Sequence, residues 1–222
     1  MRVVSLVPSV TETLLAWDVV PIAVTRFCEH PELPHVGGTK DPDVEKIASL
    51  DPDLVVVNDE ENRREDFDAL EARGLRLHVV RVTTVEQVAS ELHSLASLVE
   101  RTYEPEPLPS PVSIRTRAFI PIWRRPWMTM NGDTYGSSVL AHVGVANVFD
   151  GARERYPEVT LDAVPEVDVV LAPSEPYPFG SRHADELRTV APVRFVDGKD
   201  LFWWGVRTPG ALVRLGAALT PR

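Results

Sequence analysis

Two loops of the chain carry side chains that could bind a metal ion. Cys28 and His30 lie two positions apart in one loop, and Glu60 and Glu61 are adjacent in another. Together with His183 further along the chain, these imidazole and carboxylate groups could bind zinc, manganese or iron. The spacing matches no recognised ligand motif, so direct metal binding is an alternative and not the leading prediction.

Acid–base catalysis is the rival interpretation of the same loops. The groups that could serve it are the carboxylates Asp59, Glu60, Glu61 and Glu175 and the arginines Arg63, Arg124 and Arg125. The carboxylates could form an acid and base pair, and the arginines could hold an anionic substrate. The chain contains no GxSxG, P-loop, GxGxxG or HExxH motif. We therefore expect a protein that is not an enzyme.

Aromatic side chains gather in loops that follow predicted strands. These loops hold Phe27, His30, Trp123, Trp127, Tyr177, Phe179, Trp203 and Trp204. Ligands of open parallel sheets bind beyond the carboxyl ends of the strands. Tryptophans in the loops there are not needed to fill a hydrophobic core. The group predicts an aromatic-walled crevice for a large, flat or amphipathic ligand. The alternative is that the rings fill the seam between the lobes or pack under their own loops.

The elements that position these loops occur twice in the chain. The run 54–57 is apolar without alternation, which is typical of a parallel strand covered on both faces, and its loop begins at Asn58. A second copy, 168–171, is followed by the loop 172–179. In each copy a glutamate, Glu60 or Glu175, falls seven positions after the aspartate that opens the strand. Two similar lobes that face a shared crevice are expected.

Strands and helices alternate along both halves, which predicts an α/β fold with two Rossmann-like lobes and central parallel sheets. The predicted domains are an N-terminal lobe over 1–82, a bridging helix and Pro-rich linker over 83–112, and a C-terminal lobe over 113–222. Prolines at every second position from 105 to 111 exclude a helix there and favour an extended linker.

Local signals predict where several of these elements begin. Capping boxes are predicted at 9–12 and 84–87, and Asp41-Pro42 is predicted to cap the helix that follows it. A helix is predicted from about 181 to 190. The segment 197–205 is expected to be a loop.

Composition narrows the class of protein further. The chain has 222 residues, a hydrophobic fraction of 44% and a net charge of −10, which argues against nucleic acid as a partner. No apolar run approaches the roughly 20 residues that span a bilayer. No signal peptide is recognisable, so the chain as written is expected to be cytoplasmic. A chain trimmed at its maturation site would look identical, in which case it is periplasmic or on the cell surface.

Several segments together resemble a known family. They are VSLVPSVTE, IAVTRFCEHP, the Gly-Gly-Thr loop, DVEKIASLDPDLVVV and HVGVANVF. In this order they are similar to the substrate-binding proteins of ABC importers for vitamin B12, haem and iron–siderophore complexes, and most of all to the cobalamin-binding branch. The resemblance implies two Rossmann-like lobes with a ligand clamped between them. It implies cobalamin or another corrinoid as the first candidate, then an iron–siderophore or haem.

The resemblance also implies roles for particular residues. Phe27 matches the aromatic residue that contacts the corrin ring, and Glu45 and Asp162 match the pair that docks onto an ABC permease. His30 or His183 could be an axial ligand to cobalt or haem iron. The chain departs from the family where the segment 105–111 replaces most of a long bridging helix. A cytoplasmic corrinoid carrier or sensor is the alternative that this departure and the missing signal leave open.

The complete set of predicted ligand-binding residues is Phe27, His30, Asn58, Glu60, Trp123, Trp127, Glu175, Tyr177, Phe179, Trp203 and Trp204. No catalytic cofactor is expected, and the protein is expected to be a monomer.

Overall fold

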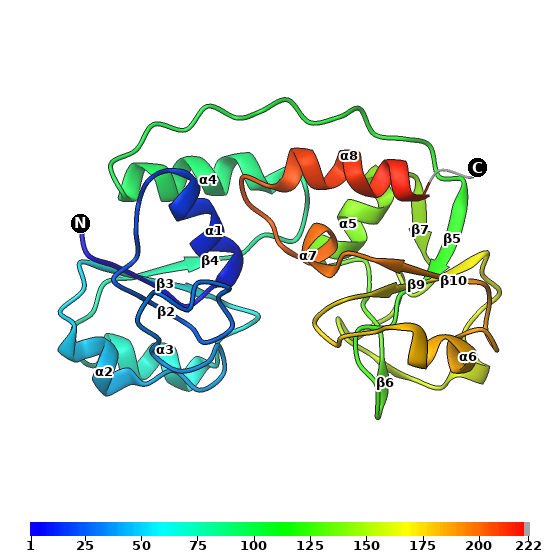
Figure 1. Ribbon diagram of the computed structural model, residues 1–222, viewed down its shortest axis with the longest axis horizontal. Helices are drawn as coiled ribbons and strands as arrows, with labels where there is room; N and C mark the ends of the chain where they lie inside the picture. Colours follow the sequence, from blue (N-terminus) through cyan, green and yellow to red (C-terminus); the bar gives the residue numbers. More distant parts are fainter. Residues whose placement is uncertain (220–222) are drawn as a thin grey trace. The chain divides into compact units, whose positions relative to one another are not determined.

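The computed structural model describes residues 1–219, which fall into two compact units. Unit 1 comprises Met1–Arg81 and Ala89–Glu104, and unit 2 comprises Val82–Val88 and the chain from Pro105 onward. Each unit contains a four-stranded parallel sheet with helices packed on it, which confirms the α/β class (Figure 1). The division at 82 and 112 stays a prediction.

Unit 1 alternates strand and helix along the chain. Its elements are β1 (Val3–Ser5), α1 (Pro8–Ala16), β2 (Ala23–Val24), α2 (Val44–Ser49), β3 (Leu54–Asn58), α3 (Arg64–Glu71), β4 (Leu77–Val80) and most of α4 (Gln87–Leu98). The strands are ordered β2-β1-β3-β4. Figure 1 shows α1 and α4 on one face of this sheet and α2 and α3 on the other.

Unit 2 repeats the plan with additions. Its elements are β5 (Thr116–Phe119), β6 (Trp127–Met128), α5 (Tyr135–His142), β7 (Val145–Asn147), β8 (Glu158–Val159), η1 (Leu161–Ala163), β9 (Val169–Pro173), η2 (Ser181–His183), α6 (Ala184–Leu187), β10 (Val193–Val196), α7 (Gly198–Phe202) and α8 (Thr208–Leu219). The parallel strands are ordered β10-β9-β5-β7, and β6 pairs with β8 in a separate antiparallel ribbon.

The first and central strands of each sheet pair at equivalent positions. Val3 pairs with Leu54 in unit 1, and Ala118 pairs with Val169 in unit 2, so both partners lie 115 positions further along (3 to 118, 54 to 169). The duplicated aspartates accept the same kind of backbone hydrogen bond in each copy. Asp53 accepts the backbone N–H of Arg2 at 2.5 Å, and Asp168 accepts that of Arg117 at 2.7 Å. The predicted duplication is therefore present in the hydrogen bonds of the strands.

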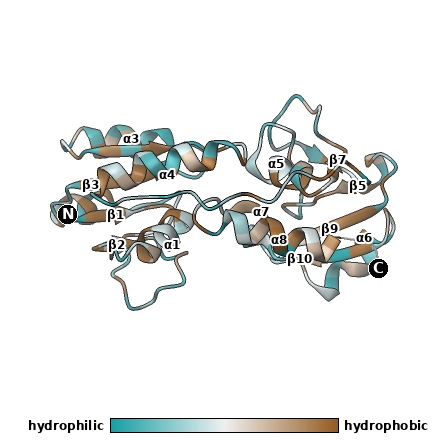
Figure 2. Cartoon of the chain, turned by 90° about the horizontal axis from the view of Figure 1, so that it is seen from above, coloured by the Kyte–Doolittle hydropathy of each residue, from teal (hydrophilic) through white to brown (hydrophobic). Residues whose placement is uncertain are grey.

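The central strands of both sheets are buried along their whole length. All five residues of β3 and all five of β9 are buried, which confirms the interpretation of their apolar runs. Each strand packs under the apolar face of a helix, with Leu70 of α3 in unit 1 and Leu187 of α6 in unit 2. Figure 2 shows β9 in the brown of hydrophobic residues, whereas α3 shows both colours.

Two of the three predicted helix caps are wrong. The third has one of the two hydrogen bonds of a capping box. Helix α1 begins at Pro8, not at Ser9, because proline cannot donate a backbone hydrogen bond and suits the first helical position. Helix α2 is capped by Asp43, which accepts the N–H of Lys46 at 3.0 Å. Before α4, Gln87 accepts the backbone N–H of Thr84 at 3.2 Å, which is one of the two bonds of a capping box.

The loops of unit 2 hold more structure than their sequences predict. Trp127 lies in β6, which pairs with a strand about thirty residues away, and so local sequence gave no signal for it. The segment predicted as a loop over 197–205 contains α7, whose N-cap Asp197 accepts the N–H of Lys199 at 2.9 Å. The helix predicted from 181 to 190 is two short pieces, η2 and α6.

The Pro-rich segment behaves as its spacing predicts. Residues 101–115 form no helix or strand. None of the helices between residues 1 and 219 combines the length and the apolar character needed to cross a membrane.

Replacing a core leucine of β9 tests the role of this strand. Leu171 is fully buried. We expect Leu171→Ala to lower the free energy of unfolding by about 2 to 5 kcal/mol, because it removes buried methyl groups and leaves a cavity. Urea denaturation measures the change. The control Val213→Ala, on a residue of α8 that is 59% exposed, should alter stability by less than about 0.5 kcal/mol. Equal effects in the two variants would contradict the burial of β9.

Candidate functional site

The predicted ligand-binding residues lie at the carboxyl ends of the parallel strands in both units. In unit 1, Phe27 and His30 follow β2, Asn58 ends β3 and Glu60 follows it. In unit 2 the corresponding residues are Trp123 and Trp127 after β5, Glu175, Tyr177 and Phe179 after β9, and Trp203 and Trp204 after β10. Each unit therefore presents its own half of the set at the edge where α/β sheets bind ligands.

The loop that carries Phe27 is held by an ion pair. Arg26 donates two hydrogen bonds to Asp41, each 2.9 Å long, and its guanidinium carbon lies 5.1 Å from the centroid of the Phe27 ring. Gly38 lies against both members of this pair, where a Cβ would collide with the Asp41 carboxylate. Phe27 is 54% exposed. The loop thus supports a large apolar ring in contact with water.

The polar residues of the unit 1 loops mostly bind their own backbone. The Asn58 side-chain oxygen accepts the N–H groups of Glu60 at 2.7 Å and Glu61 at 3.2 Å. These bonds build the turn after β3, so Asn58 shapes the loop. His30 Nδ1 lies 2.9 Å from a carboxylate oxygen of Glu32. Ligand contacts of His30, Asn58 and Glu60 stay predictions.

An aromatic cluster in unit 2 runs from the core to the surface. Trp127 stacks on Phe179 with ring centroids 5.9 Å apart and an interplanar angle of 8°. Tyr177 lies 4.7 Å from Phe179 and meets the edge of Trp123 at 5.5 Å. Phe179 is 6% exposed, whereas Trp123 is 44% exposed. The buried rings fix the cluster, and Trp123 is the member most accessible to a ligand.

His183 is a buried residue next to this cluster. It is 4% exposed, and its Nδ1 accepts the backbone N–H of Gly180 at 3.1 Å. Its Nε2 lies 3.4 Å from the Tyr177 hydroxyl and 3.2 Å from Nε of Arg182. Burial, followed by the charges of Arg182 and Arg124, lowers the pKa of His183 below its ordinary value. The imidazole is therefore neutral at pH 7.

A metal site does not assemble around either predicted histidine ligand in the described part of the chain. Between residues 1 and 219, no three His, Cys, Asp or Glu side chains come together in a way that could hold a metal ion. An axial-ligand role for His30 or His183, which needs only one protein group, stays a prediction.

The two tryptophans after β10 differ in how deeply they are buried. Trp204 is 3% exposed and belongs to the interior of unit 2. Trp203 is half-buried, with Nζ of Lys199 5.0 Å from the ring centroid and the guanidinium of Arg207 at 5.6 Å. Glu175 packs against Gly198, where an added Cβ would lie 2.5 Å from the Glu175 Cγ. The ligand contacts of these residues stay predictions.

The two predicted docking acids lie on the surface. Glu45 of α2 forms an ion pair with Arg73, and Asp162 lies in η1. Hydrogen bonds from the Thr160 hydroxyl and from its own backbone lower the pKa of Asp162. Asp162 is therefore ionised at pH 7, and the side chains of Glu45 and Asp162 are both exposed.

Comparison with known proteins bears on the identity of the fold. Residues 3–108 match the family described as periplasmic binding protein. The resemblance seen in the sequence is confirmed. The "Vitamin B12-binding protein" of Yersinia pestis (strain Pestoides F) is 29% identical over 197 aligned residues, which cover 76% of this chain and 69% of the relative.

Solved structures agree on the fold. The periplasmic vitamin B12 binding protein BtuF of Vibrio cholerae superposes with a TM-score of 0.76 at 19% identity, covering 98% of this chain and 96% of that one. A periplasmic heme binding protein from Pseudomonas aeruginosa gives 0.77 at 19% identity, covering 98% and 91%. These relatives are binding proteins by name.

Two arginines of the candidate site are not among the residues that the sequence predicts for it. Arg26 supports the Phe27 loop, and Arg182 contacts His183. A signal for them is present in the sequence, because Arg26 directly precedes Phe27 and Arg182 lies three positions after Phe179, both predicted ligand-binding aromatic residues. Single charged residues are common in loops, so this signal alone does not distinguish a role.

The neutral state of His183 predicts a pH dependence of stability. The unfolded chain takes up a proton near pH 6.5, whereas the folded protein resists it. The free energy of unfolding should therefore fall as the pH drops through about 6.5 and level off below the folded-state pKa. Urea denaturation at several pH values measures this slope. His183→Asn should have a shallower slope, and identical slopes would show that His183 does not contribute.

Proposed function

We propose that this protein is the solute-binding component of an ABC-type importer whose ligand is a large ring-shaped cofactor. Cobalamin or another corrinoid is the first candidate, and haem or an iron–siderophore is next. The observation that carries the proposal is the exposure of Phe27 and Trp123 on loops at the carboxyl ends of the strands in the two sheets. The named relatives, which bind vitamin B12 or heme, support it.

The proposed binding mode follows from the chemistry of the exposed rings. A corrin or porphyrin presents a broad apolar face that water solvates poorly, and an aromatic side chain covers such a face with little loss of conformational entropy. Phe27 from unit 1 and Trp123 from unit 2 would each contact the ligand. Their loops are already ordered by the Arg26–Asp41 pair and by the Trp127–Phe179 stack. Preorganised loops reduce the cost of ordering on binding.

The other candidate functions have no specific observation in their favour. Direct binding of a bare transition-metal ion would need several converging ligands, and the residues described from 1 to 219 bring no three together. A cleft enzyme that uses Glu60 and Glu175 finds no counterpart among the named relatives, which are binding proteins. A cytoplasmic carrier or sensor is not favoured by them either.

Delivery to a permease is the second part of the proposal. Glu45 and Asp162 would dock onto basic residues of the permease, because ionised surface carboxylates steer and orient such encounters. The binding component of an importer must bind its ligand before the ligand crosses the cytoplasmic membrane. We therefore place the protein outside the cytoplasmic membrane, in the periplasm or at the cell surface.

Removing the exposed rings tests the proposed binding mode. We expect Phe27→Ala and Trp123→Ala each to weaken cobalamin binding by about 1 to 3 kcal/mol, or about 5- to 150-fold in Kd, because each removes apolar contact with the ring. Isothermal titration calorimetry measures the affinity. These two residues are better targets than Trp127, whose removal would also disturb the packing of Phe179.

Val213→Ala is the matched control, because it removes an exposed apolar side chain of α8 that is not among the predicted ligand-binding residues. Its affinity should equal that of the unaltered protein. Wild-type affinity in both Phe27→Ala and Trp123→Ala would remove the basis of the proposed site. An absorption spectrum of protein purified from its native host adds a direct check, since corrinoids and haems are coloured.

Reversing the docking charges tests delivery separately from binding. In cells that carry Glu45→Lys or Asp162→Lys as the only copy, uptake of labelled cobalamin should fall at least about tenfold, because like charges would then face each other. Cobalamin affinity of the purified variants should not change. The control Glu71→Lys reverses another exposed carboxylate, on α3, and should take up the ligand normally. Normal uptake in both docking variants would contradict the proposed contacts.

A further inference from the structure

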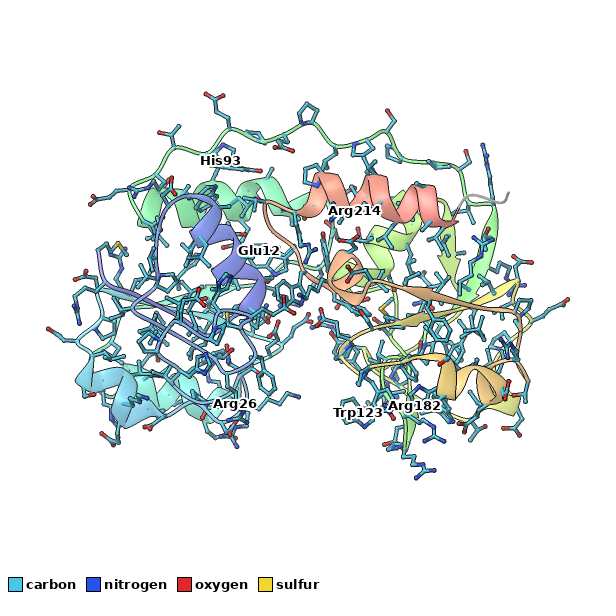
Figure 3. All side chains as sticks on the ribbon, viewed as in Figure 1. Glu12, Arg26, His93, Trp123, Arg182 and Arg214 are labelled. Atoms are coloured by element: carbon cyan, nitrogen blue, oxygen red, sulfur yellow. The ribbon has the colours of Figure 1, made fainter. Side chains whose placement is uncertain are left out.

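Three arginines belong to the segments that follow the carboxyl ends of two strands in unit 2. Arg124 and Arg125 follow Trp123 in the loop after β5, and Arg182 lies in η2 after β9. We call these three residues the arginine rim. Figure 3 labels Trp123 and Arg182, which lie in the same region of unit 2. Two loops that are distant in the sequence thus bring positive charge to the aromatic cluster.

The positive charge of the rim is only partly neutralised. Arg124 contacts one carboxylate oxygen of Glu186 through two nitrogens, at 2.9 and 2.8 Å. In the chain from residue 1 to 219, neither Arg125 nor Arg182 forms an ion pair with a carboxylate. Guanidinium groups gathered without matching carboxylates attract an anion from solution.

Four further observations connect the rim to the aromatic cluster. Arg182 Nε lies 3.2 Å from Nε2 of His183, and the Tyr177 hydroxyl interacts with Arg124. The pKa of His183 is lowered partly by Arg182 and Arg124, so both guanidiniums act on the same imidazole. Arg124 also lies 5.8 Å from the centroid of the Trp127 ring. Guanidinium and phenol donors beside stacked rings suit anionic oxygens that are attached to an apolar body.

We propose that the arginine rim binds an anionic oxygen group of the ligand, either a phosphate ester or a carboxylate, while Trp123 covers the adjoining apolar part. This inference rests on the proposed function, because it assigns a subsite within that binding surface. The two sources of charge are chemically distinct. Cobalamin carries one phosphodiester, which cobinamide lacks, whereas haem carries two propionate carboxylates that can be esterified.

The first experiment tests the rim without the cofactor. Phenyl phosphate carries an aromatic ring and a phosphate ester, and it is titrated into the protein while the ring signals of His183 are followed by NMR. We expect a saturable shift in the wild-type protein and its loss in Arg182→Gln, because His183 touches Arg182. The control Arg115→Gln replaces an exposed arginine just before the amino end of β5 and should shift as the wild type does. No saturable shift in the wild type, or an equal shift in Arg182→Gln, would overturn the inference.

The second experiment compares ligands with and without the charge by calorimetry. In Arg182→Gln and Arg124→Gln, the Kd for cobalamin should rise about tenfold while that for cobinamide stays constant, because only cobalamin offers charged hydrogen bonds to the rim. If haem is the ligand instead, haem should lose affinity in the variants and haem dimethyl ester should not. Equal losses for the charged and uncharged member of a pair would overturn the inference.

The two experiments separate two kinds of failure. If the wild-type protein binds neither corrinoid and neither haem compound, the proposed function fails. The phenyl phosphate titration then still decides whether the rim binds anions.

Discussion

The pairing of two fully buried parallel strands determines where every candidate residue lies. β3 in unit 1 and β9 in unit 2 have no face in contact with water, so their backbone groups must be satisfied by neighbouring strands. Each strand is held at its start by an aspartate that binds the backbone of the adjacent strand. With the start fixed and the register set, the end of the strand is fixed too. The loops of the site therefore begin at defined points.

The same pairing extends into the first residues of the loops. Asp59 donates its backbone N–H to Val80 at 3.3 Å, and Ser174 donates its own to Val196 at 3.1 Å. Each bond attaches the residue after the central strand to the end of the edge strand. Ser174 also accepts the N–H of Gly198 at 2.9 Å, which connects the loop after β9 to the helix after β10. The functional loops are thus extensions of the sheet hydrogen bonding, and this explains how they can hold exposed rings in place.

The sequence predicts the parts of this structure that depend on local chemistry. Uninterrupted apolar runs identify β3 and β9, and proline spacing identifies the segment 105–111, which forms no helix or strand. It fails where a distant partner decides the conformation. β6 is a strand only because β8 pairs with it. The carboxylate of Asp41 binds the distant Arg26, and Asp43 caps α2 instead.

The same limit applies to the candidate site. Counting aromatic residues after strands finds the right loops, because the topology of a parallel sheet puts all strand ends on one edge. Counting cannot tell which rings are buried. Phe179 and Trp204 are at most 6% exposed, while Phe27 and Trp123 are close to half exposed, and this difference arises from packing between loops. The composition of the loops thus predicts a site, and three-dimensional packing decides which members a ligand can reach.

Electrostatics adds a distinction that apolar packing cannot supply. Stacked rings recognise any broad apolar face, so they do not separate one macrocycle from another. Charged donors at fixed positions do, because a ligand that lacks the matching oxygen leaves them without a partner. In unit 2 both kinds of group converge on Tyr177, whose ring meets Trp123 and whose hydroxyl lies near His183. Since burial and the neighbouring arginines lower the pKa of His183, its imidazole adds no charge to that of the arginines at pH 7. Selectivity among ring-shaped ligands is therefore expected to depend on the substituents of the ring more than on the ring itself.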